Sequence, residues 1–307
     1  MNLHELTAIS HDETKAIELF EKLRWPNGPV CPHCKATDRI YVLEGVKDKN
    51  GRDRHGLKKC GHCRKQFTAR VGSIFEDSPL PIGKWLIAIY QMCSAKKGIS
   101  AKQLERQLGV NYKTAWFMCH RVREAMKAEP LRSMLGAGGG TIEVDETFIG
   151  GKVSNNKHRN RTAAAGKKTI VMTLIDREGD ARTFAVPNTK KKTLQTIMRP
   201  NIDGSAHIIT DENRSYNGVE KHFASHDTVD HSKTFVRSII FHTNFAESYH
   251  TLLKRGIIGA FHHVSEKHLP RYLQEFEFRW NRRKLTDGER FEETFAGCHP
   301  CSLCLRG

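Results

Sequence analysis

Hydrophobic and polar positions divide the first part of the chain into three segments. Apolar residues recur at helical spacing over residues 1–25, which predicts an amphipathic N-terminal helix that, with its turn, fills residues 1–28. Residues 29–70 are rich in cysteine, glycine and lysine and lack helical periodicity, whereas residues 81–128 return to it. The pattern predicts a helix, a small irregular module and a helical module, in that order.

The helical module has the pattern of two helices joined by a tight turn. Ser100 suits the N-cap of the first helix, Gly109 suits the turn, and a second helix is predicted from about Asn111. Lys113 and Arg121 on that helix are candidate contacts for a DNA major groove. The alternative is an ordinary helical hairpin with a solvated basic face, but the neighbouring modules favour DNA binding by a helix-turn-helix.

A glycine-rich segment precedes a different pattern in the second half. Residues 136–140 include three consecutive glycines, which leave the backbone very free, so we predict a linker and the main domain boundary there. Beyond it, strand-like segments first form a hairpin and then alternate with helical patterns. This order predicts an α/β domain with a mixed sheet over residues 141–290, followed by a tail over residues 291–307.

Composition narrows the class of protein. The 307 residues are 38% hydrophobic, without an apolar run near the ~20 residues that a bilayer span needs. The N-terminus carries acidic residues where an export signal needs a basic start, so we expect a cytoplasmic protein with no membrane partner. The net charge is +16, and residues 31–140 alone hold 21 basic and 9 acidic side chains. Such a balance is typical of a polyanion binder.

Four cysteines in this basic segment form two CxxC knuckles. In chain order they are Cys31, Cys34, Cys60 and Cys63. Because a reducing compartment disfavours disulfides, two knuckles 25 residues apart are typical of a four-thiolate zinc site. We therefore predict a zinc ribbon over residues 29–70, in which structural Zn²⁺ supplies folding energy. The short tail offers no second knuckle, so no second zinc site is predicted at Cys298, Cys301 and Cys304.

Three acidic residues of the second half are candidate catalytic metal ligands. Asp145 lies within a hydrophobic strand, where a carboxylate without a positive partner is costly. Asp211 follows the C-terminal end of another strand, where α/β folds expose their chemistry. Glu247 begins a predicted helix that carries Lys254 on the same face. Hard oxygen ligands from these elements suit two Mg²⁺ ions, which stabilise attacking and leaving oxygens in phosphoryl transfer.

Each carboxylate also has a structural interpretation. Asp145 can pair with an arginine, and Asp211 can be a turn residue. Asn244 and Glu247 have the spacing of a helix capping box. Taken together in a DNA-binding context, the acidic residues favour a catalytic site. Glu143, two residues before Asp145, is the first substitute ligand.

Basic residues near the candidate ligands are candidate phosphate contacts. Between residues 150 and 169 the chain has six lysines and arginines and no acidic residue, which is typical of a basic loop that clamps phosphates. A solvated loop is the alternative. The predicted DNA contacts outside the helical module are Lys152, Arg159, Arg161, Lys254 and Arg255.

Several unusual strings occur in an order that resembles the transposases of the bacterial insertion-sequence 1595 family. They are CPHC with CGHC, KWLIAIY, VDETFIGGK, TDE, HTNFAESYHTLLKRG, FHHVSEKHL and RYLQEFEFRWNRR, spread over residues 16–284. The resemblance implies an N-terminal zinc ribbon and a ribonuclease-H-like catalytic domain of the DDE type, with Asp145 and Asp211 as its aspartates. The third ligand varies in that family, so Glu247 is our choice and Asn244 the reserve.

Together these features predict a multi-domain transposase that binds the terminal inverted repeats of an insertion sequence. The expected chemistry is DNA cleavage and strand transfer with Mg²⁺ or Mn²⁺, beside structural Zn²⁺. The expected partner is double-stranded DNA, which includes the element ends and the target. We expect the protein to form a homo-oligomer on this DNA and so to associate with the nucleoid. The alternatives are a catalytically inactive DNA-binding protein or regulator, and a structure-selective nuclease.

Overall fold

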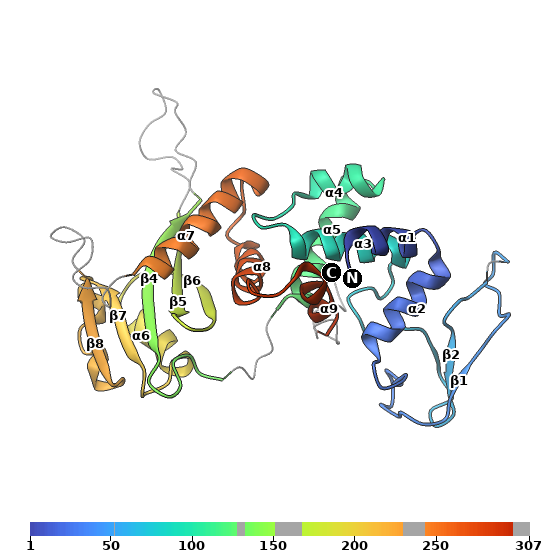
Figure 1. Ribbon diagram of the computed structural model, residues 1–307, viewed down its shortest axis with the longest axis horizontal. Helices are drawn as coiled ribbons and strands as arrows, with labels where there is room; N and C mark the ends of the chain where they lie inside the picture. The colour runs from blue at the N-terminus through green and yellow to red at the C-terminus, as the bar shows by residue number, and fades with distance from the viewer. Residues whose placement is uncertain (52, 128–132, 151–167, 230–242, 297–307) are drawn as a thin grey trace. The chain divides into compact units, whose positions relative to one another are not determined.

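The computed structural model describes residues 1–51, 53–127, 133–150, 168–229 and 243–296. Two units make up the chain: one joins Met1–Lys127 to Lys284–Gly307, and the other is Ala128–Arg283 (Figure 1). The division falls before the glycine-rich segment, so the boundary predicted at residues 136–140 is wrong. Within the described ranges, no helix is long and apolar enough to cross a membrane.

The N-terminal segment forms two helices where the sequence predicted one. Helix α1 spans Leu3–Ser10 and helix α2 spans Glu13–Arg24. Asp12 is the N-cap of α2, and its side chain accepts hydrogen bonds from the backbone amides of Thr14 and Lys15. The hydrophobic spacing continues through the break, so only the cap reveals it.

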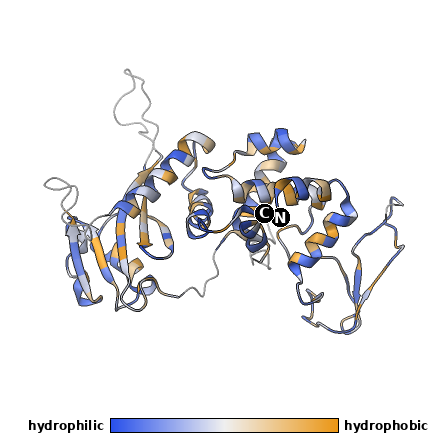
Figure 2. Cartoon of the chain, in the orientation of Figure 1, coloured by the Kyte–Doolittle hydropathy of each residue, from blue (hydrophilic) through white to orange (hydrophobic). Residues whose placement is uncertain are grey.

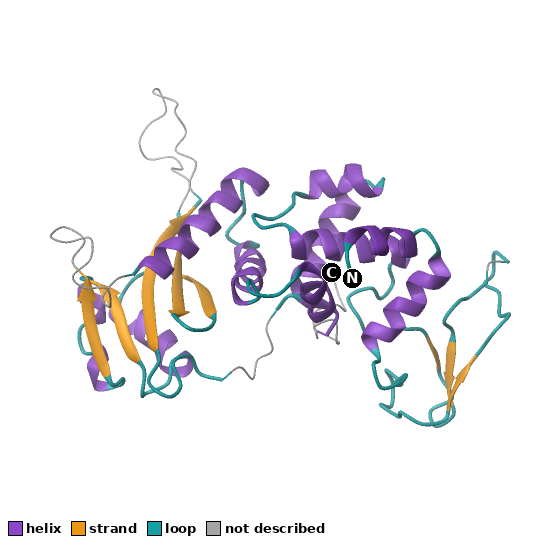
Figure 3. Cartoon of the chain, viewed as in Figure 1, coloured by secondary structure: helices purple, strands orange, loops and turns teal. Residues whose placement is uncertain are grey.

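The ribbon and the helical module follow in the same unit (Figure 3). The ribbon has an antiparallel sheet of β1 (Ile40–Val42), β2 (Lys58–Cys60) and β3 (Gln66–Phe67). The helices after it are α3 (Ile82–Ser94), α4 (Ala101–Leu108) and α5 (Tyr112–Ala125). Ser100 and Asn111 cap α4 and α5, and Gly109 adopts the left-handed conformation between them. The predicted helix pair is confirmed.

The C-terminal helix belongs to the first unit. Helix α9 spans Asp287–Ala296, and its Phe291 and Phe295 side chains are buried. The Phe295 ring stacks on Phe75 at a centroid distance of 6.0 Å. The second unit therefore ends at residue 283 and not at 290, and the predicted tail from residue 291 starts inside a packed helix. Its aromatic residues complete the core of a unit formed far earlier in the chain, which local patterning does not indicate.

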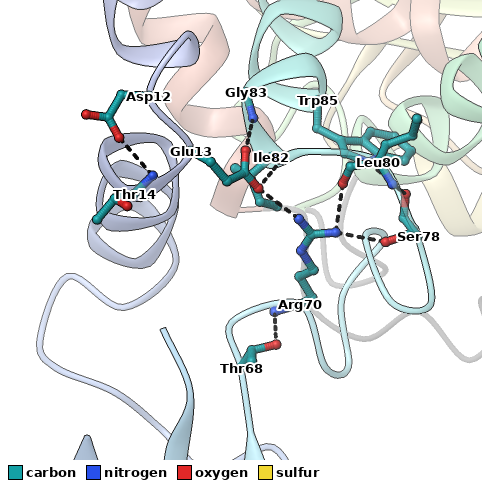
Figure 4. Close-up of polar contacts among 10 residues, drawn as sticks. All are labelled: Asp12, Glu13, Thr14, Thr68, Arg70, Ser78, Leu80, Ile82, Gly83 and Trp85. Atoms are coloured by element: carbon teal, nitrogen blue, oxygen red, sulfur yellow. Dashed lines mark hydrogen bonds and ion pairs between the residues drawn. The ribbon is translucent and has the colours of Figure 1, made fainter. Parts of the chain in front are cut away.

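A partly buried ion pair ties α2 to α3 and to the end of the ribbon (Figure 4). Glu13 lies 3.1 Å from Arg70, and its carboxylate accepts hydrogen bonds from the backbone amides of Ile82 and Gly83. Because helix N-termini carry partial positive charge, this carboxylate stabilises the start of α3. Arg70 also donates to two backbone carbonyls, those of Ser78 and Leu80.

The second unit is an α/β domain with a five-stranded mixed sheet in the order β6-β5-β4-β7-β8. The strands are β4 (Thr141–Ile149), β5 (Thr169–Asp176), β6 (Ala181–Val186), β7 (His207–Asp211) and β8 (Ser225–Val229). Strand β5 is antiparallel to β4 and β6, whereas β7 is parallel to β4 and β8. The predicted α/β domain with a mixed sheet is confirmed.

Helices cover both faces of this sheet. Helix α6 (Lys191–Asn201) packs on one face, while α7 (Asn244–Gly256) and α8 (Leu269–Asn281) pack on the other. Hydrophobic colour runs along β7, whereas these helices carry mixed colour because only one side of each is buried (Figure 2). Short helical turns complete the domain at η1 (Arg214–Tyr216), η2 (Val219–Lys221) and η3 (Ile257–Phe261).

The glycine-rich segment is a fitted turn of this domain. Gly136 donates its backbone amide to Asp176 at 3.1 Å and has a φ of 72°. A Cβ atom at this position would lie 2.7 Å from the Ala206 side chain. Glycine is therefore required at position 136 because the Ala206 side chain comes close and because φ is positive. A need for a flexible linker between domains is not the reason.

Candidate functional site

Asp145, in the middle of β4, and Asp211, at the end of β7, come together just beyond the last paired residues of these parallel strands. The pairing of β4 with β7 ends at Glu143 and Ile209, and the two aspartates follow two residues later on each strand. Because paired strands keep their register, the two aspartate side chains lie side by side just beyond the last paired residues of β4 and β7. Each offers an oxygen to a group whose ligand atoms all lie within 4.8 Å of one another.

Glu146 is the third member of this group, and the sequence analysis did not single it out. Its backbone amide donates to Asp145 Oδ1 at 2.7 Å. Its Oε1 atom is buried and has no hydrogen-bond partner in the part of the chain that the structure describes. A buried, unpartnered carboxylate oxygen beside two further carboxylates fits a divalent cation. The available signal was the presence of consecutive acidic residues within a largely buried strand.

The electrostatics of the group agree with such a role. Burial, together with the negative charges of Asp211 and Asp145, raises the pKa of Glu146 from its ordinary value to about 7. Burial also raises the pKa of the neighbouring Tyr216 hydroxyl well above its ordinary value. Carboxylates held together in this way repel one another, and a bound cation would remove that repulsion.

Glu247 and Asn244 lie outside this group, at the start of α7. Both side chains are exposed, and Glu247 does not belong to the cluster of acidic ligands found among the described residues. Asn244 is the first residue of α7 and Thr243 is its N-cap, so the capping-box interpretation is wrong. Glu247 is exposed in the first turn of α7, and its role as third ligand remains a prediction.

Glu143 is not a substitute ligand, because both of its carboxylate oxygens have structural partners. Its side chain is fully buried, and Oε1 lies 2.8 Å from Nε of Arg177. Its Oε2 accepts hydrogen bonds from the backbone amides of Phe245 and Ala246, at 2.9 and 3.1 Å. These amides are in the first turn of α7. Glu143 thus attaches the positive end of α7 to β4.

Helix α7 also contacts the metal-ligand group through His250. This buried side chain places Nδ1 3.3 Å from Asp145 Oδ2 and Nε2 2.9 Å from Thr173 Oγ1. The helix lies alongside β4 and β5 (Figure 1), the two strands that carry these partners. A single histidine on a helix gave no signal in the sequence.

The four ribbon cysteines converge as predicted. The Sγ atoms of Cys31 and Cys63 are 3.7 Å apart, and those of Cys34 and Cys60 are 3.5 Å apart. A zinc tetrahedron with bonds of ~2.3 Å has sulfur–sulfur edges of about 3.8 Å, so the spacing fits Zn²⁺. Hydrogen bonds from backbone amides, that of Cys63 first, lower the pKa of Cys60 to about 6 and favour the thiolate. The cluster supports a structural zinc site.

The predicted DNA contacts differ in their surroundings. Lys113 is exposed in the first turn of α5, and Lys254 and Arg255 are exposed in the last turn of α7. Arg121 instead uses Nη1 to donate to the backbone carbonyls of Ile74 and Glu76, so it attaches α5 to the preceding segment. The remaining predicted residues lie outside the described ranges: Lys152, Arg159, Arg161, Cys298, Cys301 and Cys304.

Comparison with known families gives two matches along the chain. Residues 137–281 match the ISXO2-like transposase domain, and residues 11–66 match the transposase zinc-ribbon domain. An uncharacterized protein in transposable element ISH50 of Halobacterium salinarum is 25% identical over 287 residues, which cover 87% of this chain and 90% of that protein. An uncharacterized transposase-like protein of Haemophilus influenzae is 28% identical over 103 residues, covering 34% of this chain and 82% of its own.

Comparison with solved structures gives low-scoring matches to a pre-cleavage Mos1 transpososome and a Mos1 strand transfer complex. The first has a TM-score of 0.28 and 16% identity, and covers 69% of this chain and 78% of its own. The second has a TM-score of 0.27 and 15% identity, with coverage of 70% and 78%.

Proposed function

Because this chain belongs to the insertion-sequence 1595 family of transposases, we propose that it binds the terminal inverted repeats of its element and catalyses metal-dependent DNA cleavage and strand transfer. The observation that carries the proposal is the convergence of Asp145 and Asp211 at one end of the sheet, with a third carboxylate beside them. These two aspartates are also the positions that the family resemblance implies.

The reaction consists of two in-line displacements at phosphorus. Water cleaves a phosphodiester bond at the element end to leave a 3′-hydroxyl, which then attacks a phosphodiester of the target DNA. Divalent cations, when bound, neutralise the charge that develops on the attacking and leaving oxygens. Asp145 and Asp211 would hold them, while Lys254 and Arg255 on α7 would hold DNA phosphates.

Two residues compete for the role of third ligand. Glu146 already lies within reach of the two aspartates and has an unpartnered buried oxygen. Glu247 is the choice that family resemblance favours, and it occupies the first turn of a helix attached beside Asp145. Substitution of each by glutamine, which keeps the shape and removes the charge, separates them.

The N-terminal unit would recognise the DNA. The zinc ribbon and the α4–α5 helix pair carry most of the net positive charge of the chain, and Lys113 is exposed at the start of the second helix. Two element ends must be held together, so we expect a homo-oligomer on DNA. The protein would act in the cytoplasm on the nucleoid.

The test is Mg²⁺- or Mn²⁺-dependent nicking and joining of duplex DNA that carries the element ends. Asp145→Asn and Asp211→Asn should each lower the rate by about 10³-fold, since losing a metal ligand removes several kcal/mol of transition-state stabilisation. Glu178→Gln, an exposed hairpin residue of the same domain, is the matched control. If the aspartate variants nick as fast as the parent, the chain is a DNA-binding protein without this chemistry. Nicking without joining would indicate a structure-selective nuclease.

A further inference from the structure

We propose that His250 is a positioning residue that orients the Asp145 carboxylate for the divalent cation. The inference rests on the proposed function, because it assumes that Asp145 is a metal ligand. It assigns a role to a residue outside the acidic group, on α7, which the DDE pattern does not include.

The geometry begins with two side chains on neighbouring strands. Asp145 and Thr173 are direct partners in the antiparallel pairing of β4 with β5, so their side chains stand on the same face of the sheet. His250 descends from α7 onto that face and contacts both: Nδ1 lies 3.3 Å from Asp145 Oδ2, and Nε2 lies 2.9 Å from Thr173 Oγ1. Both ring nitrogens are therefore engaged.

The roles of the two ring nitrogens follow from the chemistry of the groups that they face. An ionised carboxylate has no proton to offer, so the Nδ1 atom that faces Asp145 at 3.3 Å is the protonated one. The Thr173 hydroxyl either donates or accepts, which lets it hold Nε2 in the orientation that Asp145 requires. Thr173 is fully buried and the His250 side chain is only 7% exposed, so water does not compete for these contacts.

The contact fixes the orientation of the Asp145 carboxylate. Its Oδ1 accepts a hydrogen bond from the backbone amide of Glu146 at 2.7 Å, and its Oδ2 lies 3.3 Å from Nδ1 of His250. With one donor on each oxygen, the carboxylate plane cannot turn freely, yet each oxygen keeps a lone pair for a cation. Hydrogen bonds that orient a metal ligand in this way typically change metal affinity by about 10- to 100-fold when removed.

The position of α7 on β4 does not depend on His250. Glu143, on the same strand and the same face as Asp145, binds the amides of Phe245 and Ala246. The helix thus stays on β4 when the histidine ring is changed, so a variant can test the contact without releasing α7.

The experiment measures Mn²⁺ affinity of the full-length, zinc-loaded protein, without DNA, from the electron paramagnetic resonance signal of free Mn²⁺. His250→Phe keeps a ring and removes both nitrogens, and should weaken binding by 10-fold or more. His250→Asn keeps a donor near the Nδ1 position, and should stay within about threefold of the parent. Tyr249→Phe, a change in the adjacent buried side chain, is the matched control and should have no effect.

Thr173→Val provides a second route if His250→Phe does not fold. It leaves the histidine in place but frees its Nε2 end, and should weaken Mn²⁺ binding by several-fold. The double variant Thr173→Val, His250→Phe should bind Mn²⁺ as weakly as His250→Phe alone, because both substitutions interrupt the same series of contacts from Thr173 through His250 to Asp145. Thermal unfolding of every variant reports whether it is folded.

The outcomes separate this inference from the proposed function. If Asp145→Asn removes Mn²⁺ binding but folded His250→Phe binds like the parent, the positioning role is wrong and the metal site stands. If His250→Asn is as weak as His250→Phe, the donor is not the cause and the role is also wrong. If the parent binds no more Mn²⁺ than an Asp145→Asn, Asp211→Asn double variant, both proposals fail.

Discussion

The carboxylate of Glu143 accepts a hydrogen bond from the backbone amide of Phe245 at 2.9 Å, across 102 residues of sequence. The same carboxylate binds Arg177, so a buried negative charge on β4 is balanced by a guanidinium on one side and by the start of α7 on the other. This contact decides where α7 lies along β4. It therefore also decides where His250 and Glu247 lie with respect to Asp145.

Removing that carboxylate should destabilise the second unit. Glu143→Ala leaves Arg177 without its carboxylate partner and releases two backbone amides, so we expect a loss of about 3 to 5 kcal/mol in the free energy of unfolding. Urea unfolding followed by fluorescence measures it. Glu178→Ala, on the exposed hairpin next to Arg177, should cost less than about 0.5 kcal/mol. Equal stability of Glu143→Ala and the parent would show that the anchor is unimportant.

Zinc removal should unfold the ribbon. Cys60→Ser replaces a thiolate of the tetrahedral cluster, and we expect the purified protein to lose its ~1 Zn²⁺ per chain. Elemental analysis gives the metal content, and Co²⁺ substitution reports tetrahedral thiolate ligands by its absorption. Cys119→Ser, at a buried position of α5, should retain the metal. A folded ribbon with no metal in the parent would refute the zinc site.

Divalent-cation affinity should depend on pH through Glu146. Its pKa is raised from its ordinary value of 4.5 to about 7, so the native metal-free protein keeps this proton as the pH rises through that window. The unfolded chain loses the same proton near pH 4.5. Glu146 therefore lowers the free energy of unfolding progressively between pH 4.5 and 7, and its full destabilising effect is present above pH 7. Since a cation must displace the proton, Mn²⁺ affinity should fall by up to about tenfold per pH unit below 7.

Mn²⁺ titration at pH 6 and pH 8 tests this dependence. In Glu146→Gln the side chain carries no proton to displace, so the difference between the two pH values should shrink. The same steep dependence in that variant would mean that another group is responsible.

Lys113 and Arg121, two of the cationic residues of α5, should affect different properties. Lys113→Ala should weaken DNA binding uniformly across sequences and lower the salt dependence by about one counterion, as expected for a phosphate contact. Arg121→Ala should mainly lower thermal stability, because its guanidinium binds the carbonyls of Ile74 and Glu76. DNA affinity across a salt series and thermal unfolding separate the two. If Arg121→Ala binds DNA poorly without losing stability, its structural role is wrong.

Local chemistry explains which parts of the fold were predictable. Ser100, Gly109 and Asn111 mark helix ends through caps and a left-handed turn, and these act over a few residues. The cysteine knuckles were predictable for a similar reason, because zinc geometry restricts the spacing of its ligands. The membership of α9 in the first unit was not predictable, since its buried Phe295 packs on Phe20, 275 positions earlier in the sequence.

By itself, the sequence determined the paired helices and the mixed α/β sheet, and it indicated the four cysteines and the two aspartates that come together in the structure, because each is encoded by spacing, hydrophobic period or strand position. Only the tertiary structure decided which further carboxylate joins Asp145 and Asp211, and that Glu143 anchors a helix instead. The physical reason is that side-chain roles in this site depend on strand register and on where α7 docks, and both are set by contacts between residues distant in the chain.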